Sequence, residues 1–161
     1  AILDPNEIFY TSFEPVQKHR FILYVDGIPS YIIKKMGSVK ADQTPVALNH
    51  INLIRYVKGK TKWSPIDLTL YSPITPSGSQ AAMEWFRLHH ESVTGRDGYS
   101  DFYKKDLTLN VLGPVGDIVS EVIVKGAQIT SLDLGDYSWD SEGEAQEIKL
   151  TIQPDRCILN Y

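Results

Sequence analysis

The sequence has little cysteine and no long apolar run. Cys157 is the one cysteine among 161 residues, so no disulfide can form within the chain, which fits a protein that folds in a reducing cytoplasm. No apolar run approaches the roughly 18 residues that a membrane-spanning helix needs, so we expect no membrane insertion by the chain itself. The composition, 42% hydrophobic and 22% charged, is typical of a single globular domain over residues 1–161.

Signatures of catalysis and of cofactor binding are also lacking. His89 and His90 are adjacent, so on a helix they point about 100° apart and cannot share a face as metal ligands do. No glycine-rich loop follows a strand and opens a helix, and no serine lies in a nucleophile-elbow pattern. Asp97, Ser100 and Asp101 fit a solvated turn better than a calcium loop. We therefore expect no enzyme, no metal and no cofactor.

Alternating apolar residues predict strands through most of the chain after an N-terminal arm over residues 1–18. In the stretch 66–71, for example, Ile66, Leu68 and Leu70 share one face. Asp26-Gly27 predicts a hairpin between the runs on either side of it, and 113–116 predicts a turn between two later strands. We also expect two strands around Gly59, with Pro45 breaking the pattern before them.

Only the stretch 79–92 predicts a helix. Ser77 followed by Gln80 matches a capping box, and Ala81, Trp85 and Leu88 form an apolar stripe. The segment that follows, 93–101, reads as a loop. The predicted fold is mainly β: two packed antiparallel sheets that form a β-sandwich or barrel with one α-helix.

Charge is unevenly distributed along the chain, whose net charge is −4. One segment carries seven basic residues against Asp42 alone: Lys34, Lys35, Lys40, Arg55, Lys58, Lys60 and Lys62. A later segment carries six carboxylates and no basic residue: Asp133, Asp136, Asp140, Glu142, Glu144 and Glu147. The acidic segment is open to several interpretations, namely a solvated face, a catalytic carboxylate pair, or a docking surface for the basic segment of another copy. Pairing of the two segments within one chain is a rival to the last.

The order of elements resembles the tail tube proteins of contractile-tailed, T4-like bacteriophages. The matching pattern is "EVIVKGAQIT" followed by "LDLGDYSWDSEGEAQEIKLTIQPD", with Gly126, the Trp139-Asp140-Ser141 core, and Asp155 near the end. The double strand "PVALNHINLIRYVKGKTKWSPIDLTLY" and the helix "MEWFRLHHE" also fit, so the resemblance spans the chain from about Arg20 onward.

The resemblance implies a structural role. Members of that family form hexameric rings that stack into a hollow tube inside a contractile sheath, and DNA passes along the lumen. The implied partners are other copies of the chain, the tail sheath, baseplate and tail terminator proteins, and the tape measure protein and DNA in the lumen. The implied location is the virion, after assembly in the host cytoplasm. A baseplate tube initiator, or a tube subunit of a type VI secretion or extracellular injection system, is an alternative.

On this hypothesis the basic and acidic segments are subunit interfaces, and the stretch 37–62 reaches the adjacent ring. Strands within 30–40, 51–58, 67–71 and 107–112 would pair with the sheets of neighbours. Trp139 would either anchor the acidic interface or pack within its own subunit. A carbohydrate-binding β-sandwich is an alternative from another class, with an aromatic platform of Tyr99, Phe102, Tyr103, Tyr137 and Trp139.

Overall fold

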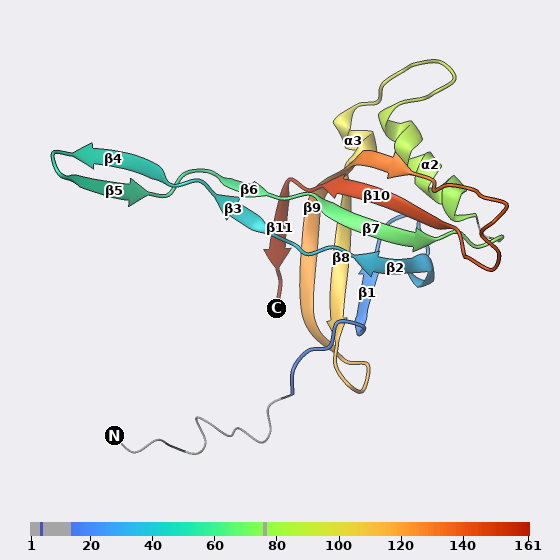
Figure 1. Cartoon of the computed structure of the whole chain (residues 1–161), viewed down its shortest axis with the longest axis horizontal. Coiled ribbons are helices and arrows are strands. Elements are labelled where there is room, and N and C mark those ends of the chain that lie inside the picture. The colour runs from blue at the N-terminus through green and yellow to red at the C-terminus, as the bar shows by residue number, and fades with distance from the viewer. Residues whose placement is uncertain (1–3, 5–13, 76) are drawn as a thin grey trace.

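The computed structural model describes residue 4 and residues 14–75 and 77–161. The predicted arm over residues 1–18 therefore lies largely outside the described residues. The rest is mainly β, as predicted, and the central body is an antiparallel sheet folded into two half-sheets (Figure 1). No helix among the described residues is long and apolar enough to cross a membrane.

The first half-sheet contains four strands, in the order β1-β8-β9-β11. Their bounds are Phe21–Tyr24 for β1, Lys105–Leu112 for β8, Ile118–Asp133 for β9 and Arg156–Leu159 for β11. The predicted turn at 113–116 joins β8 to β9, which confirms that expectation. The chain ends beside β9, because Asn160 donates its backbone N–H to the Glu121 carbonyl.

The second half-sheet has the order β9-β10-β7-β2, so β9 belongs to both half-sheets. The other bounds are Glu147–Gln153 for β10, Ile66–Tyr71 for β7 and Ile33–Met36 for β2. The strand β9 passes from one half-sheet to the other near Gly126, whose φ is +64°. A Cβ there would lie 2.2 Å from Asp155 Oδ2, and the glycine N–H donates to Asp106 Oδ1 at 3.1 Å. Only glycine fits this position without strain.

The core lies between the half-sheets and under the helix. On β7 and β10 every second residue is buried, which confirms the alternation predicted for Ile66, Leu68 and Leu70. Full burial of each such side chain contributes about 1.5–3 kcal/mol. The largest fully buried side chains are Trp85, Leu23, Ile66, Leu68, Leu70, Leu107, Ile148, Leu150, Ile152 and Val124.

The predicted helix is α2, Gly78–His89, and it closes one end of the core. Ser77 caps it as expected, because its side chain accepts from the Gln80 N–H at 3.3 Å. The helix ends before residue 92 because His90 has extended backbone angles. Two further details were wrong: Leu88 is exposed, and the segment predicted as a loop contains a short helix, α3, Ser100–Tyr103.

Asp26-Gly27 forms a tight turn, but the hairpin predicted around it was wrong. Gly27 has φ +82°, and the Ile28 N–H donates to the Val25 carbonyl at 3.1 Å, as a tight turn requires. The chain then passes through a 3-10 turn, Ser30–Ile32, into β2. Strand β1 pairs with β8 and β2 pairs with β7, so the two runs belong to different half-sheets.

A long hairpin leaves the second half-sheet between β2 and β7 (Figure 1). Its base pairs β3, Ala41–Gln43, with β6, Thr61–Trp63. Its tip pairs β4, Val46–His50, with β5, Leu53–Val57. The chain reverses at Ile51-Asn52, and Gly59 joins β5 to β6 along one arm. The strands around Gly59 are therefore present, while Pro45 separates β3 from β4 along the other arm.

Candidate subunit interface

The hairpin tip exposes large apolar side chains on both of its faces. Register places Val46 opposite Val57 and Leu48 opposite Arg55, while Ile54 and Tyr56 lie on the other face. Ile51, at the turn, is fully exposed. The two hairpin pairings form small sheets separate from the seven-stranded sheet, and a lone two-stranded hairpin is at best marginally stable in water. Both faces of the tip therefore lack the apolar cover that a stable hairpin needs.

The predicted basic residues divide into two groups. Lys34 and Lys35 lie on β2, where a bulge turns both side chains toward the outer face of the second half-sheet. The remaining five lie along the hairpin and are all exposed: Lys40, Arg55, Lys58, Lys60 and Lys62. Lys40 lies 3.8 Å from Asp42. Within the part of the chain that the structure describes, the other four form no ion pair.

The acidic segment forms the connection between β9 and β10. We name residues 134–146 the acidic loop; Asp133 and Glu147 are the strand residues that flank it. Short contacts hold its two ends: Gly135 N–H donates to Asp133 Oδ1 at 2.8 Å, and Gln146 Nε2 donates to the Leu134 carbonyl at 2.7 Å. The middle of the loop, including Asp136, Asp140, Glu142 and Glu144, is exposed.

Trp139 is fully exposed at the middle of this loop, with a relative accessibility of 102%. The interpretation that Trp139 packs within its own subunit is therefore wrong. An indole left entirely in water has a large apolar surface available for a partner. Tyr137, two residues earlier, is also exposed.

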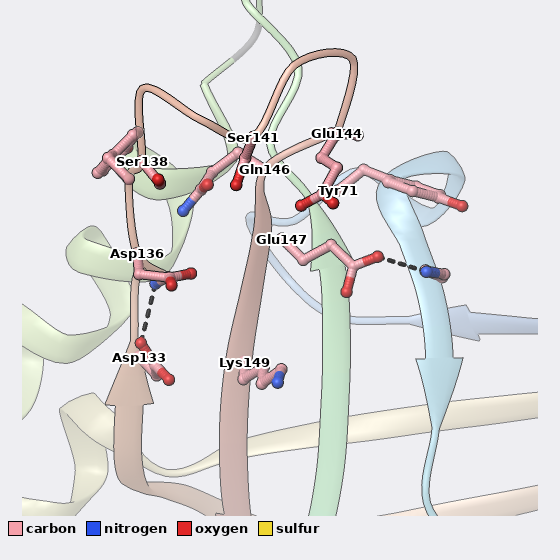
Figure 2. A pocket seen from close by; sticks show the side chains of 13 residues that line it. Tyr71, Asp133, Asp136, Ser138, Ser141, Glu144, Gln146, Glu147 and Lys149 are labelled. Atoms are coloured by element: carbon pink, nitrogen blue, oxygen red, sulfur yellow. Dashed lines mark hydrogen bonds and ion pairs between the residues drawn. The ribbon is translucent and has the colours of Figure 1, made fainter.

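An open pocket of about 900 Å³ lies beneath the acidic loop (Figure 2). Its lining comes from the loop, β9, β10, β7 and β2, with four carboxylates and two lysines. The charged lining residues are Asp133, Asp136, Glu144, Glu147, Lys34 and Lys149. Among the described residues, no group of three or more His, Cys, Asp or Glu side chains is arranged to hold a metal ion.

One ion pair joins the basic and acidic segments within the chain. Lys34 Nζ donates to Glu147 Oε1 at the edge of this pocket (Figure 2). The hydrogen bond raises the pKa of Lys34 and lowers the pKa of Glu147, so both groups are held in their charged forms. Pairing within the chain is thus realised at this position. The remaining predicted acidic residues form no ion pair in the described ranges.

The unpaired charges lie at opposite ends of the molecule. The hairpin extends from one end of the longest axis, and the acidic loop lies toward the other end (Figure 1). One end is basic and apolar, and the other is acidic with an exposed indole. Two unlike, complementary ends fit a head-to-tail contact between copies, because a symmetric contact would bring like ends together.

No protein-family model matches the chain, and no curated protein is similar to it at a significant level. Solved structures are similar. A chain of the anti-feeding prophage cap, the AFP tube-terminating cap, is 16% identical, with 92% of this chain and 93% of that chain covered and a TM-score of 0.75. The sheath/tube terminator structure of the extracellular contractile injection system PVC gives 16% identity, 94% and 100% coverage, and a TM-score of 0.75.

The PVC sheath-tube complex in its extended state gives 18% identity, 98% coverage of both chains, and a TM-score of 0.68. The chain has the tube-protein fold of contractile injection systems. The β-sandwich predicted from the sequence is thereby confirmed. Coverage above 90% of each neighbour means that this one fold accounts for nearly all of each chain.

The charge pattern missed the apolar residues of the hairpin tip. The candidates chosen from the sequence were charged residues and Trp139, whereas Leu48, Ile51, Ile54 and Tyr56 are among the exposed apolar side chains. A signal was present in "VALNHINLIRYV", where apolar residues fall on both alternating sets of positions. That pattern indicates a strand covered on both faces.

Proposed function

We propose that this chain is the repeating structural subunit of the inner tube of a contractile tail, and that it is not an enzyme. Copies stack head to tail, with the hairpin of one copy on the acidic end of the next. The observation that carries the proposal is the hairpin, whose tip exposes apolar residues on both faces at the end opposite the acidic loop. The tube-protein fold of the neighbours supports it.

The axial contact combines apolar burial with charge. Exposed apolar side chains of the tip, such as Ile51 and Leu53, would each contribute up to about 1.5–3 kcal/mol if they became fully buried. Lys58, Lys60 and Lys62 at the base would meet carboxylates of the acidic loop, which sets orientation and register more than affinity. Trp139 supplies a large apolar surface at the receiving end.

Strand pairing between neighbours within a ring can use only the strands at the edges of the sheet. Strands β7 and β8, which contain the stretches 67–71 and 107–112, each pair on both sides within the chain, so their predicted pairing with neighbours was wrong. Strand β2, within 30–40, ends the sheet and has a free edge among the described strands. Pairing of such edges around a closed ring would give their unpaired backbone N–H and C=O groups hydrogen-bond partners.

The finer proposal is a bacteriophage tail tube built from stacked hexameric rings. Its partners would be other copies, the sheath, the baseplate, the tail terminator, and the tape measure protein and DNA in the lumen. Its place would be the virion, after assembly in the host cytoplasm. The resemblance of the segment 121–155 to phage tail tubes supports this version.

A tube terminator, or a tube subunit of an extracellular injection or type VI secretion system, is the second candidate. The neighbours with a TM-score of 0.75 come from tube-terminating structures, which favours it. Glycan binding has less support, because the aromatic residues proposed for one platform are divided between two regions. Tyr99, at the N-cap of α3, and Phe102, within α3, lie with their rings tilted against each other, whereas Tyr137 and Trp139 lie in the acidic loop.

Negative-stain electron microscopy of the purified full chain tests the proposal. We expect rings or rods at high protein concentration. The matched control replaces 46–57, the hairpin tip, with a short glycine-serine turn. This variant should keep the thermal unfolding midpoint of the body, because the tip pairs only with itself, yet form no rods. Monomers of the wild-type chain at all concentrations and salts, or rods from the tip-less variant, would contradict the proposal.

A further inference from the structure

The two half-sheets differ in the side chains that they turn away from the core. On the second half-sheet, strand alternation places Asp67, Thr69 and Tyr71 of β7 outward, with Glu147, Lys149 and Thr151 of β10 beside them. The hydrogen bond from Thr151 Oγ1 to Asp67 Oδ1, at 3.1 Å, confirms that these rows share a face. This face carries no aliphatic side chain on its two central strands.

The outward face of the first half-sheet is more apolar. Ile22 of β1, Ile123 of β9 and Ile158 of β11 lie on the side opposite the buried Leu23 and Val124. They form two cross-strand rows with Tyr24, Thr108, Asn110 and Glu121, and Lys125 and Arg156 form the next row on the same face. The apolar part of this face would be stabilised by a covering layer of protein.

Asn110 also lies on this face and is enclosed by its own chain. It pairs in register with Ile22 and Glu121 on the outward face, and only 7% of it is accessible. Its Oδ1 atom is buried and has no hydrogen-bond partner among the described residues. A buried acceptor without a donor costs about 1–3 kcal/mol, and its own chain already encloses this atom, so a covering protein could donate to it only if the neighbouring side chains moved.

Charges on the outward face of the second half-sheet are balanced. Three lysines and three carboxylates lie there: Lys34, Lys35, Lys149, Asp67, Asp133 and Glu147. Lys34 forms an ion pair with Glu147, and Lys149 is opposite Asp133 in the register of β9 and β10. Each of these two lysines has an acidic neighbour, so this face offers no cluster of unpaired positive charge for a phosphate backbone to bind.

Continuity with the hairpin also distinguishes the two faces. The hairpin leaves from β2 and returns into β7, so it extends the second half-sheet toward the next copy (Figure 1). In a head-to-tail stack this half-sheet and the hairpins would form one continuous wall along the tube.

We propose that the outward face of the second half-sheet lines the channel and that the outward face of the first half-sheet is turned to a surrounding protein layer. This assignment rests on the proposed tube function. A solvated channel wall with balanced charge does not bind a hydrated polyanion, so the polyanion can move along the channel. The more apolar face takes the opposite position, where another protein covers it.

The two faces offer a matched pair of threonines for the test. Thr69 of β7 and Thr108 of β8 are both half-buried and both lie on interior strands, but on the outward faces of different half-sheets. Thr69→Cys and Thr108→Cys are prepared in a Cys157→Ser background. Each is treated with a bulky polyethylene-glycol maleimide as an unassembled chain and again as assembled tubes, and the shifted band is followed on a gel.

We expect assembly to remove nearly all labelling of Thr69→Cys and to leave labelling of Thr108→Cys largely unchanged, while a small maleimide reaches both. Protection of Thr108→Cys in place of Thr69→Cys, or equal labelling of Thr69→Cys in tubes and free chains, would overturn the assignment. Ser131→Cys, on the exposed end of β9, replaces Thr69→Cys if that variant does not assemble. Failure of every variant and of the wild type to form tubes would refute the tube function itself.

A second arm tests the balance of charge. Tubes of the Glu147→Gln, Asp133→Asn double variant should retain labelled single-stranded DNA that wild-type tubes release. Glu84→Gln, Glu91→Gln, which removes two exposed carboxylates from α2 and the loop after it, is the control and should not retain DNA. Equal retention by the two double variants would contradict a channel position for the second half-sheet.

Discussion

Substitution of Ile51 at the hairpin turn should separate assembly from folding. Its side chain is fully exposed in the single chain, so Ile51→Ser removes no contact from the folded monomer. An exposed substitution of this kind changes the free energy of unfolding by no more than about 0.5 kcal/mol. If the tip is buried by the next copy, the same change loses the full burial of an isoleucine, about 1.5–3 kcal/mol.

Each 1.4 kcal/mol is a factor of ten in an association constant, so the critical concentration for tube formation should rise about 10- to 100-fold. Sedimentation of tubes over a protein dilution series gives this concentration, and thermal unfolding by circular dichroism gives the monomer stability. Val93→Ser is the control, because Val93 is nearly as exposed but lies in the loop after α2, away from the hairpin. An unchanged critical concentration for Ile51→Ser, or an equal rise for Val93→Ser, would refute the reasoning.

Three further predictions test charge, pH and backbone conformation. Reversal of Lys58, Lys60 and Lys62 to Glu should weaken tube formation in a sedimentation assay while the monomer stays folded. Mixing this variant with a chain that carries Asp136→Lys, Glu142→Lys and Glu144→Lys should restore tube formation. An unchanged tube yield after the lysine reversal would contradict the axial contact. His89 stacks on Tyr103, and its Nε2 accepts from the Ile129 N–H at 3.2 Å. Burial lowers the pKa of His89, so its contribution to stability is complete above the unfolded value of about 6.5 and is lost as pH falls below it. His89→Gln should reduce this pH dependence of the unfolding midpoint, while the control His90→Gln should retain it. Identical pH profiles of the two variants would contradict the role assigned to His89. Gly126→Ala should destabilise by more than the roughly 1–2 kcal/mol expected for positive φ alone, because its Cβ would overlap Asp155, which also pairs with Lys104 at 2.8 Å. Gly143→Ala has a similar φ of +75° and open space around its Cβ, so it measures the backbone cost by itself in denaturant unfolding.

Local pattern predicted those elements whose environment is set by one buried face. Strand β7 alternates because one face lies on the core, and α2 begins where Ser77 caps it. The helix was overextended because nothing in "HHES" signals that His90 becomes extended and bridges to Asp97.

Pairing over long distances was not predictable in the same way. Asp26-Gly27 specifies a reversal of the chain, but the two runs separate after the turn because each has a more extensive partner elsewhere, β8 for one and β7 for the other. The loss of alternation in "VALNHINLIRYV" looked like an imperfect strand. This pattern is expected of a strand that is covered on both faces. The single chain does not contain that cover, so the pattern could not be interpreted from one chain alone.

The environment of Trp139 could likewise not be predicted from the sequence. A lone tryptophan in a polar loop is compatible with packing inside or outside its own subunit. Only the conformation of the acidic loop shows that the indole stays in water: the loop is held at its ends and by a backbone turn at Ser138, and the Trp139 side chain is fully exposed.

The direction of the strands that continue into the hairpin has a mechanical consequence. Strands β2, β7 and β10 run along the longest axis of the molecule, as the hairpin does (Figure 1). Hydrogen bonds of antiparallel strands lie perpendicular to the strands, so tension along this axis shears a whole row of them at once instead of opening them one after another. A column built in this way would resist stretching along its axis better than a sideways bend, and a column pulled apart would be expected to part between copies, leaving each body intact.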